Sequence, residues 1–317
     1  MLDYCSNNSI VSSQFRFEYA HDFSEGLANV TVNGRSGFIV KDGSFVIPPV
    51  YNSELCYIFG KDIPYYLFNE GLAIVSFGEN PHRMYGCINH SGDIVVSPAF
   101  SCLHPFSEGM AAFQEGGVWG FIDIGGKKVI PSRFESAGDF HDGLAPVKIA
   151  TNKYYYINKE GKEVLTKTSN LVLSFDEYFP GGRAMFQNAH NFCDGLARVT
   201  CYEKNGVIDT SGRFREEKTP VWMKCSEGLA VVHEGGKRGY RDSHGDLIIP
   251  CRFDDAAPFH EGIAAVILNG KVGYIDRCGS FIIKPTFDKG RNFHEGLAAV
   301  EKDGRWGYID RSGEQVI

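Results

Sequence analysis

The sequence lacks the features that mark membrane, secreted and nucleic-acid-binding proteins. No apolar stretch approaches the length of a bilayer span, and the first residues have neither the basic nor the apolar segment of a secretory signal. The nine cysteines stand singly, without a Cys-x-x-Cys pair, which favours free thiols in a reducing compartment. The net charge is −7, and no basic stripe is present to neutralise phosphates. We therefore expect a cytoplasmic protein that neither inserts into a membrane nor binds nucleic acid, with export by a leaderless route left open.

Catalytic motifs are missing as well. The sequence has no Gly-x-Ser-x-Gly elbow, no phosphate-binding loop and no His-Glu-x-x-His zinc motif. The glycine pairs Gly116-Gly117, Gly125-Gly126 and Gly235-Gly236 fit hairpin turns. These absences predict a non-enzymatic protein with no catalytic residues, no metal site and no cofactor.

Glycine and aromatic residues are abundant, and they recur in a fixed order. Eight times the chain reads aromatic, small polar residue, carboxylate, glycine, aliphatic, alanine, most clearly from Phe293 to Ala298. We call this the turn motif. Its glycines are Gly26, Gly71, Gly109, Gly143, Gly195, Gly228, Gly262 and Gly296, and the last four lie about 34 residues apart. A period of this size indicates one supersecondary unit repeated along the chain.

One repeat, from Phe259 to Phe287, shows the expected unit. The turn motif precedes three predicted strands, at residues 263–267, 273–276 and 281–283. Asn269-Gly270 joins the first two strands as a hairpin signal, and Pro285 ends the third because proline cannot donate a ladder hydrogen bond. The sequence therefore predicts an all-β protein of about eight three-stranded antiparallel meanders of about 34 residues each.

These residues resemble the WG repeat (also called the KWG repeat), a bacterial family named for its Trp-Gly pair. The resemblance covers the chain from about Phe17 to Ile317, although only Trp119 and Trp306 precede the strand glycine. Other residues fill that slot elsewhere: Ser36, Tyr85, Asn205, Arg238 and Val272; in the fourth repeat Tyr155 replaces the glycine itself. The resemblance implies a repeat fold and a binding role, and it carries no catalytic residues over.

The repeats could stack as a curved β-solenoid or close as an eight-bladed propeller-like ring. We expect the solenoid, because propeller blades usually have four strands and 40 or more residues. One detail favours the ring: the last repeat stops at Gln315-Val316-Ile317, and residues 15–23 match residues 133–140. Residues 1–22 are accordingly expected to be a partial repeat or cap, followed by the repeat array at 23–317.

Two long insertions interrupt the array, at residues 52–64 and 168–190. Both are rich in aromatic residues, which anchor many protein interfaces, and insertions in repeat arrays often form the binding face. The residues expected to contact a partner are Tyr57, Phe59, Tyr65, Tyr66, Phe175, Tyr178, Phe179 and Arg183. The alternative is that these side chains fill gaps in the stack or form a capping hairpin.

Three repeated columns of polar residues have structural explanations. The turn-motif acids are Glu25, Glu70, Glu108, Asp142, Asp194, Glu227, Glu261 and Glu295; one acid in every repeat fits a turn requirement better than glycoside hydrolysis. A second column fits Asx turns: Asn89, Asp123, Asn158, Asp209, Asp242, Asp276 and Asp310. His141, His260 and His294 share a small-polar slot; a zinc site at the last two lacks an evident third ligand.

The most favoured function is a scaffold that binds a protein partner, for example as a bacterial effector, regulator or inhibitor. A second hypothesis is a carbohydrate- or cell-envelope-binding module that uses Trp119, Trp306 and the tyrosines as sugar platforms. A hydrolase using Asp176 and Glu177 is a third, less favoured hypothesis. Exposed strand edges could also lead to self-association.

Overall fold

The structure is a computed structural model built almost entirely of β-strands. It describes residues 15–52, 57–58, 61–62, 67–78, 82–150, 153–165, 186–193, 195–201, 204–216, 226–242 and 245–317, and these contain no helix. No helix with the length and hydrophobicity to cross a bilayer occurs in this described part. By its contacts the chain divides into two units: unit 1 comprises residues 1–53 and 223–317, and unit 2 comprises residues 54–222.

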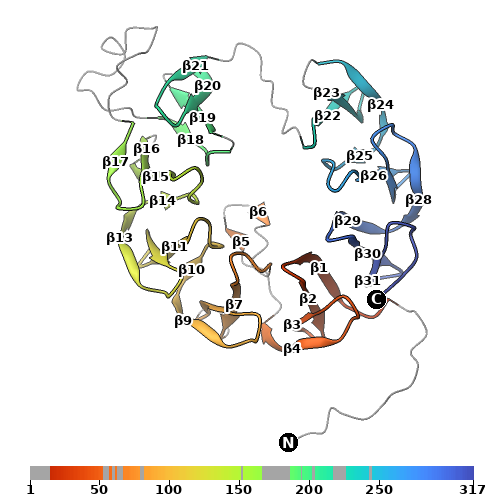
Figure 1. The fold of residues 1–317 in the computed structure, drawn as a ribbon, viewed down its shortest axis with the longest axis horizontal. Helices are drawn as coiled ribbons and strands as arrows, with labels where there is room; N and C mark the ends of the chain where they lie inside the picture. Colours follow the sequence, from red (N-terminus) through yellow and green to blue (C-terminus); the bar gives the residue numbers. More distant parts are fainter. Residues whose placement is uncertain are drawn as a thin grey trace, which may run out of the picture. The chain divides into compact units, whose positions relative to one another are not determined.

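Unit 1 contains four antiparallel sheets, which we call blades (Figure 1). Blade 1 is β1 (Tyr19–Ser24), β2 (Leu27–Val32), β3 (Arg35–Ile39) and β4 (Phe45–Asn52). Blade 6 is β22 (Leu229–Glu234), β23 (Lys237–Asp242) and β24 (Leu247–Phe253). Blade 7 is β25 (Asp255–Ala256), β26 (Ala264–Leu268), β27 (Lys271–Ile275) and β28 (Phe281–Phe287). Blade 8 is β29 (Lys289–His294), β30 (Leu297–Lys302) and β31 (Arg305–Ile309).

Unit 2 contains four further blades and one small hairpin. Blade 2 is β7 (Ala73–Phe77), β8 (Met84–Ile88) and β9 (Ile94–Phe100). Blade 3 is β10 (Cys102–Leu103), β11 (Met110–Glu115), β12 (Val118–Asp123) and β13 (Lys128–Phe134). Blade 4 is β14 (Ser136–Ala137), β15 (Ala145–Ala150), β16 (Lys153–Ile157) and β17 (Glu163–Val164). Blade 5 is β18 (Asn188–Ala189), β19 (Leu196–Cys201), β20 (Lys204–Asp209) and β21 (Phe214–Glu216); the hairpin is β5 (Tyr57–Ile58) with β6 (Lys61–Asp62).

Most blades have one strand more than the sequence predicts. The three expected strands are present, but residues that we expected to link the repeats form an additional first strand, such as β25 before the turn motif of blade 7. β25 is short because only Asp255 and Ala256 pair with β26. The prediction of three-stranded repeats is therefore wrong for these blades, and the repeating sheet is a four-stranded meander.

The turn motif closes a two-residue hairpin between the first and second strands. In blade 7, His260 and Ile263 exchange both backbone hydrogen bonds across Glu261 and Gly262. Glu261 has a φ of 53° and Gly262 a φ of 78°. Both central residues are thus left-handed, as a type I′ turn requires. Glycine adopts this conformation freely, whereas a glutamate does so at a cost of about 1–2 kcal/mol.

A glycine in the third strand allows the fourth strand to bulge over it. In blade 3, Trp119 pairs with Phe134 and Phe121 pairs with Ile130, so residues 131–133 bulge between these two pairs. A Cβ atom on Gly120 would lie 2.5 Å from the carbonyl oxygen of Ile130. The glycine of the family's Trp-Gly pair is therefore needed for close backbone approach.

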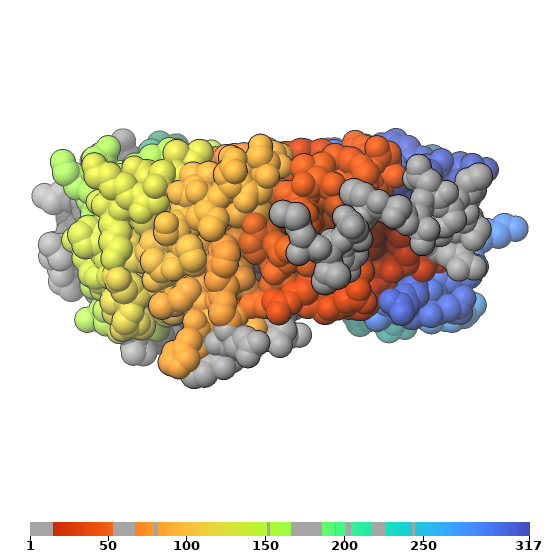
Figure 2. Space-filling view, turned by 90° about the horizontal axis from the view of Figure 1, so that it is seen from below, coloured from red at the N-terminus to blue at the C-terminus, as the bar shows by residue number. Residues whose placement is uncertain are grey.

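Both ends of the described chain contribute to the last sheet. Phe17 forms an antiparallel bridge to Trp306, and the Tyr308 amide donates a hydrogen bond of 2.8 Å to the Ile317 carbonyl. These two pairs correspond to Phe134 with Trp119 and Ile130 with Phe121 in blade 3. Figure 1 shows β1 beside β29–β31, and Figure 2 shows red N-terminal residues adjoining blue C-terminal ones. The fourth strand of blade 8 is thus assembled from residues 315–317 and 15–17.

This shared strand and the blade architecture correct the predicted arrangement. Each hydrophobic cluster lies between two successive blades: Tyr274 of blade 7, for example, packs with Phe293 of blade 8. Four-stranded sheets that pack in this way, with one sheet completed by both ends of the chain, are the blades of a β-propeller. The fold is an eight-bladed β-propeller, the alternative that the sequence left open. The predicted solenoid is wrong because the last sheet is not capped but completed by residues 15–17.

The bulge predicts which glycine substitutions should lower the stability of the fold. We expect Gly120→Ala to lower the free energy of unfolding by about 1–3 kcal/mol, because the added methyl group overlaps the backbone of β13. Gly125→Ala is the control: its Cβ would meet only the Asp123 carboxylate, at 3.5 Å, so the change should stay within about 0.5 kcal/mol. Urea unfolding of both variants tests the bulge, and equal stabilities would contradict it.

The shared strand can be tested at Phe17, whose side chain is buried in the cluster between blades 8 and 1. Phe17→Ala should cost about 3–5 kcal/mol through lost burial and the resulting cavity. Val316→Ala, in the same composite strand but 47% exposed, should have little effect. Thermal melting compares the two variants. A Phe17→Ala protein that melts at the same temperature as the wild type would show that residues 15–17 do not complete blade 8.

Candidate functional site

Blade 4 departs from the repeat at the position of the bulge. Tyr154 bridges Phe186 and Tyr156 pairs with Val164, so these pairs match Trp119 with Phe134 and Phe121 with Ile130 in blade 3. Residues 165–185 therefore stand where blade 3 has only its three-residue bulge. Most of the insertion expected at residues 168–190 therefore falls in the sequence between these two pairs, both of which involve β16.

Tyr155 explains why the ordinary bulge is absent from blade 4. It occupies the slot of the strand glycine, and at the equivalent Gly239 a Cβ would lie 2.5 Å from backbone atoms of the fourth strand. With a tyrosine there, a fourth strand cannot approach so closely, and Leu165, the residue after β17, has a left-handed φ of 65°. The Tyr155 side chain is buried against blade 3, in a cluster with Phe134 and Val147.

A cavity of about 210 Å³ opens beside Tyr155. Its lining comes from the end of β13 and from blade 4, with five aromatic or aliphatic residues and two charged ones: Arg133, Phe134, Val147, Ile149, Tyr155, Ile157 and Glu163. The Arg133 guanidinium lies 5.0 Å from the centre of the Phe134 ring and donates a 2.9 Å hydrogen bond to the Gly161 carbonyl. The site thus combines an aromatic and aliphatic floor with one cationic and one anionic side chain.

A second cavity occupies the equivalent place in blade 8. It measures about 350 Å³ and lies between β28 and blade 8, next to the interrupted strand formed by residues 315–317 and 15–17. Lys302 there corresponds to Ile149, Ile309 to Ile157 and Gln315 to Glu163. Both cavities therefore lie where the regular three-residue bulge is replaced.

Most of the partner-binding residues expected from the sequence are not placed. Tyr57 belongs to β5, where only the backbone is described. The others lie outside the described residues: Phe59, Tyr65, Tyr66, Phe175, Tyr178, Phe179 and Arg183. Asp176 and Glu177, considered for a hydrolase, also lie outside them. The cavity residues were missed, because no local motif marks them; the substitution of tyrosine for glycine at position 155 was the available signal.

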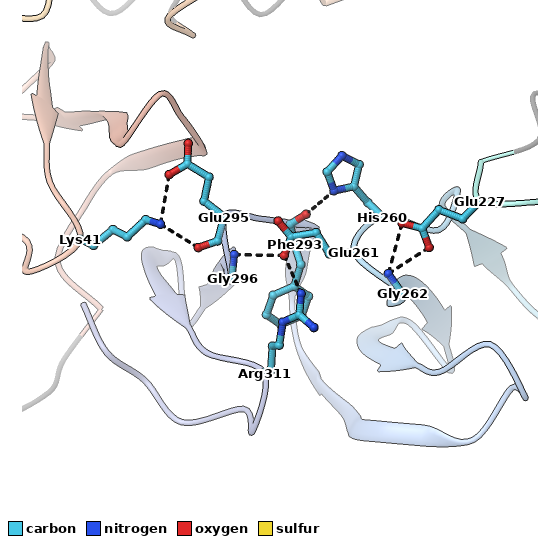
Figure 3. A network of polar contacts seen from close by, with 9 residues as sticks. All are labelled: Lys41, Glu227, His260, Glu261, Gly262, Phe293, Glu295, Gly296 and Arg311. Carbon is cyan, nitrogen blue, oxygen red and sulfur yellow. Dashed lines mark hydrogen bonds and ion pairs between the residues drawn. The ribbon is translucent and has the colours of Figure 1, made fainter.

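The column of acids has a structural role, and it acts between blades. Six of the described carboxylates accept a hydrogen bond from the turn-motif glycine amide of the next blade, as Gly296 N to Glu261 Oε2 at 3.0 Å (Figure 3). The same bond joins Gly26 to Glu295, Gly109 to Glu70, Gly143 to Glu108, Gly195 to Asp142 and Gly262 to Glu227. This bond between blades gives a reason for an acid at a left-handed position that glycine or asparagine would fill more easily.

The neighbouring small-polar slot and a basic residue strengthen these junctions. The His260 Nδ1 atom lies 2.7 Å from the Phe293 carbonyl oxygen of the next blade, and Asn69 and Ser107 make the corresponding bonds in unit 2. The Arg311 guanidinium donates a 2.9 Å hydrogen bond to Glu261. Burial raises the pKa of Glu261, but the bonds from Arg311 and Gly296 outweigh it and hold this pKa below its ordinary value.

The other polar columns are also accounted for. Asp276 Oδ1 accepts the amide of Cys278 two residues on, as an Asx turn requires, and the same bond occurs at Asn89, Asp123, Asp209 and Asp310. The His260 and His294 rings lie 4.0 Å apart, so the two histidines do meet. Among the described residues, however, no group of three potential ligands is arranged to hold a metal ion.

Comparison with known proteins assigns the family. The model of the WG containing repeat matches the chain five times, over residues 11–35, 85–119, 119–154, 239–271 and 273–306, which together make up about half of it. The chain therefore belongs to the WG repeat family, as the turn motifs and strand glycines indicated. A search of the curated proteins finds no match to this sequence.

Solved structures similar to this chain have very low sequence identity to it. A crystal structure titled as the eukaryotic initiation factor is 12% identical with a TM-score of 0.52, covering 94% of this chain and 86% of that chain. BamB from Moraxella catarrhalis is 12% identical with a TM-score of 0.48, covering 92% and 95%. Virginiamycin B lyase from Staphylococcus aureus is 15% identical with a TM-score of 0.40, covering 75% and 90%. At such identities a shared fold carries no function across.

The bond between blades predicts a graded response at Glu261. Glu261→Ala removes the acceptor for Gly296 and Arg311 and should cost about 1–3 kcal/mol of unfolding free energy. Glu261→Gln keeps an oxygen for the Gly296 amide and should cost less. Glu160→Ala, at an exposed turn of blade 4, is the control. Urea unfolding measures all three, and an alanine variant as stable as the control would refute the role assigned to the acid.

Proposed function

We propose that this protein is a non-enzymatic scaffold that binds a protein partner through blade 4. The observation that carries the proposal is the cavity beside Tyr155, at the blade whose bulge is replaced by residues 165–185. Repeat proteins commonly place recognition on the elements that interrupt the repeat. Four of the eight residues expected to bind a partner, Phe175, Tyr178, Phe179 and Arg183, belong to that same inserted sequence, so this part of the sequence argument and the cavity favour the same blade.

The size and lining of the cavity favour a protein side chain over a small molecule. At about 210 Å³ it is smaller than the pockets of roughly 300–1,000 Å³ that enclose small-molecule ligands. Its floor of Phe134, Val147 and Ile157 offers apolar contacts, while Arg133 and Glu163 supply charges of both signs. An apolar centre with polar neighbours is the composition of a protein–protein interface. A partner that inserts one aromatic or branched aliphatic side chain would fit.

The cellular setting belongs to the same proposal. A bacterial, cytoplasmic protein that binds and regulates or inhibits a cognate protein is consistent with the isolated cysteines and the net charge of −7. No step of this function needs a cofactor or catalytic residue. The second hypothesis, carbohydrate binding through Trp119 and Trp306, is not supported by the burial of these residues. Trp119 is 1% and Trp306 5% exposed, so neither offers a face to a sugar ring.

Ile149 provides a direct test, because it lines the cavity and is 43% exposed. A photo-crosslinking amino acid at position 149 should capture a partner in native-host lysate that the same group at Ile248 of blade 6, 45% exposed and outside both cavities, does not capture. With that partner purified, Ile149→Lys should weaken binding at least tenfold, or about 1.4 kcal/mol. Ile248→Lys should leave the affinity unchanged.

Two outcomes would contradict the proposed site. Capture of the same proteins from both positions would show non-specific apolar contact, as would equal affinities of the two lysine variants. Capture from neither position would show that blade 4 is not the contact surface.

A further inference from the structure

The junction between blades 8 and 1 contains a cluster of titratable side chains. His21 and Asp22 come from β1, Arg291 and His294 from β29, and His260 from the turn motif of blade 7. The Asp22 Oδ2 atom lies 3.8 Å from His294 Nε2, and the His294 ring centre lies 4.0 Å from that of His260. The cluster adjoins the bridge by which residues 15–17 complete blade 8.

His21 is the most deeply buried member of this cluster. Its side chain packs at 4.9 Å from the Tyr19 ring, its carbonyl accepts a 2.6 Å hydrogen bond from the Tyr308 hydroxyl, and the residue is 5% exposed. Burial lowers the pKa of His21 to about 3, and the positive charge of Arg291 acts in the same direction. His21 is therefore neutral in the folded protein at every pH near neutrality.

The charges that surround His294 and Asp22 shift the pKa values of these two groups in both directions. Burial lowers the pKa of His294 and His260 lowers it further, whereas Asp22, Glu261 and Glu295 raise it; the net direction is downward. Burial raises the pKa of Asp22, opposed by Arg291, His294 and His260. The Asp22 Oδ1 atom is buried and has no hydrogen-bond partner among the described residues. The junction thus holds two histidines that resist protonation beside an incompletely satisfied carboxylate.

We propose that this junction is an acid-sensitive seam of the fold, at which acidification releases residues 15–17 from β31 because the two histidines gain protons only when they reach water. Opening the junction exposes His21 and His294 and allows them to be protonated. Arg291, which hydrogen-bonds the Tyr19 hydroxyl at 2.5 Å and lies over the Trp306 ring at 5.8 Å, connects the cluster to the bridged strand.

The direction follows from proton linkage. A histidine whose folded pKa lies below its unfolded value of about 6.5 contributes stability that is full above that pH and lost as the pH falls. For His21 the loss continues down to about pH 3. The pKa of Asp22 is raised in the folded protein, so this carboxyl acts in the direction opposite to the histidines. It adds stability as the pH falls through its folded pKa. Below pH 6.5 the two histidines dominate, and below about pH 5.5 His21 alone should increase the opening constant about tenfold per pH unit.

Amide hydrogen exchange at single residues tests the seam. The Trp306 amide is bonded to Phe17 across the seam, and the Tyr154 amide makes the same bond to Phe186 in blade 4. Between pH 6.5 and 5, after correction for intrinsic exchange, protection at Trp306 should fall by at least about 15-fold relative to Tyr154. Parallel behaviour of the two amides in the wild-type protein would overturn the proposal, whatever the variants do.

Two substitutions assign the effect to the histidines. His21→Gln should remove most of the pH dependence at Trp306, and His294→Asn should reduce it; asparagine already serves in this slot at Asn69, where it bonds the Phe106 carbonyl. His233→Asn, at an exposed site on β22, is the matched control and should leave the dependence intact. A dependence that persists undiminished in the His21→Gln, His294→Asn double variant would also overturn the proposal.

Discussion

The close approach of the fourth strand to a glycine in the third is the constraint on which the rest of this structure depends. With no Cβ at Gly120, three residues of β13 bulge across the sheet and the strand then pairs again at Phe134. The bulge lies between two fixed residue pairs of the third and fourth strands. These pairs can therefore persist when the segment between them is longer or is interrupted. In blade 4 residues 165–185 separate the two pairs in the sequence, and in blade 8 the two pairs are made by residues near the two ends of the described chain. Both cavities lie at these two places.

The repeated polar residues hold successive blades together. Glu261 bonds Gly296 and Arg311 of the next blade, and Glu295 bonds Gly26 and Lys41 in the same way. The junction of blades 8 and 1 thus uses the same carboxylate–glycine bond as the junction of blades 7 and 8. Its additional titratable groups, His21 and Asp22, are what make it respond differently to acid.

The sequence predicted the local elements better than their arrangement. The turn motifs, the hairpin at Asn269-Gly270, the Asx turns and the strand glycines could be assigned because each depends on neighbours within a few residues. The short first strands were missed because β25, for example, pairs through only two residues and has no pattern of its own. The choice between solenoid and propeller depended on pairing between Phe17 and Trp306, which no local pattern encodes, although the match of residues 15–23 to 133–140 pointed towards it.

The same distinction explains why function is hard to infer from the repeated residues. The carboxylates, small polar residues and Asx side chains are engaged in bonds within or between blades, so few of their polar atoms remain for a ligand. Trp119 and Trp306 are buried for the same reason. The proposed recognition therefore rests on positions where the repeat fails, and Tyr155 is such a position: it replaces the strand glycine and a cavity lies beside it. A residue that breaks the family pattern is therefore more informative about binding here than one that follows it.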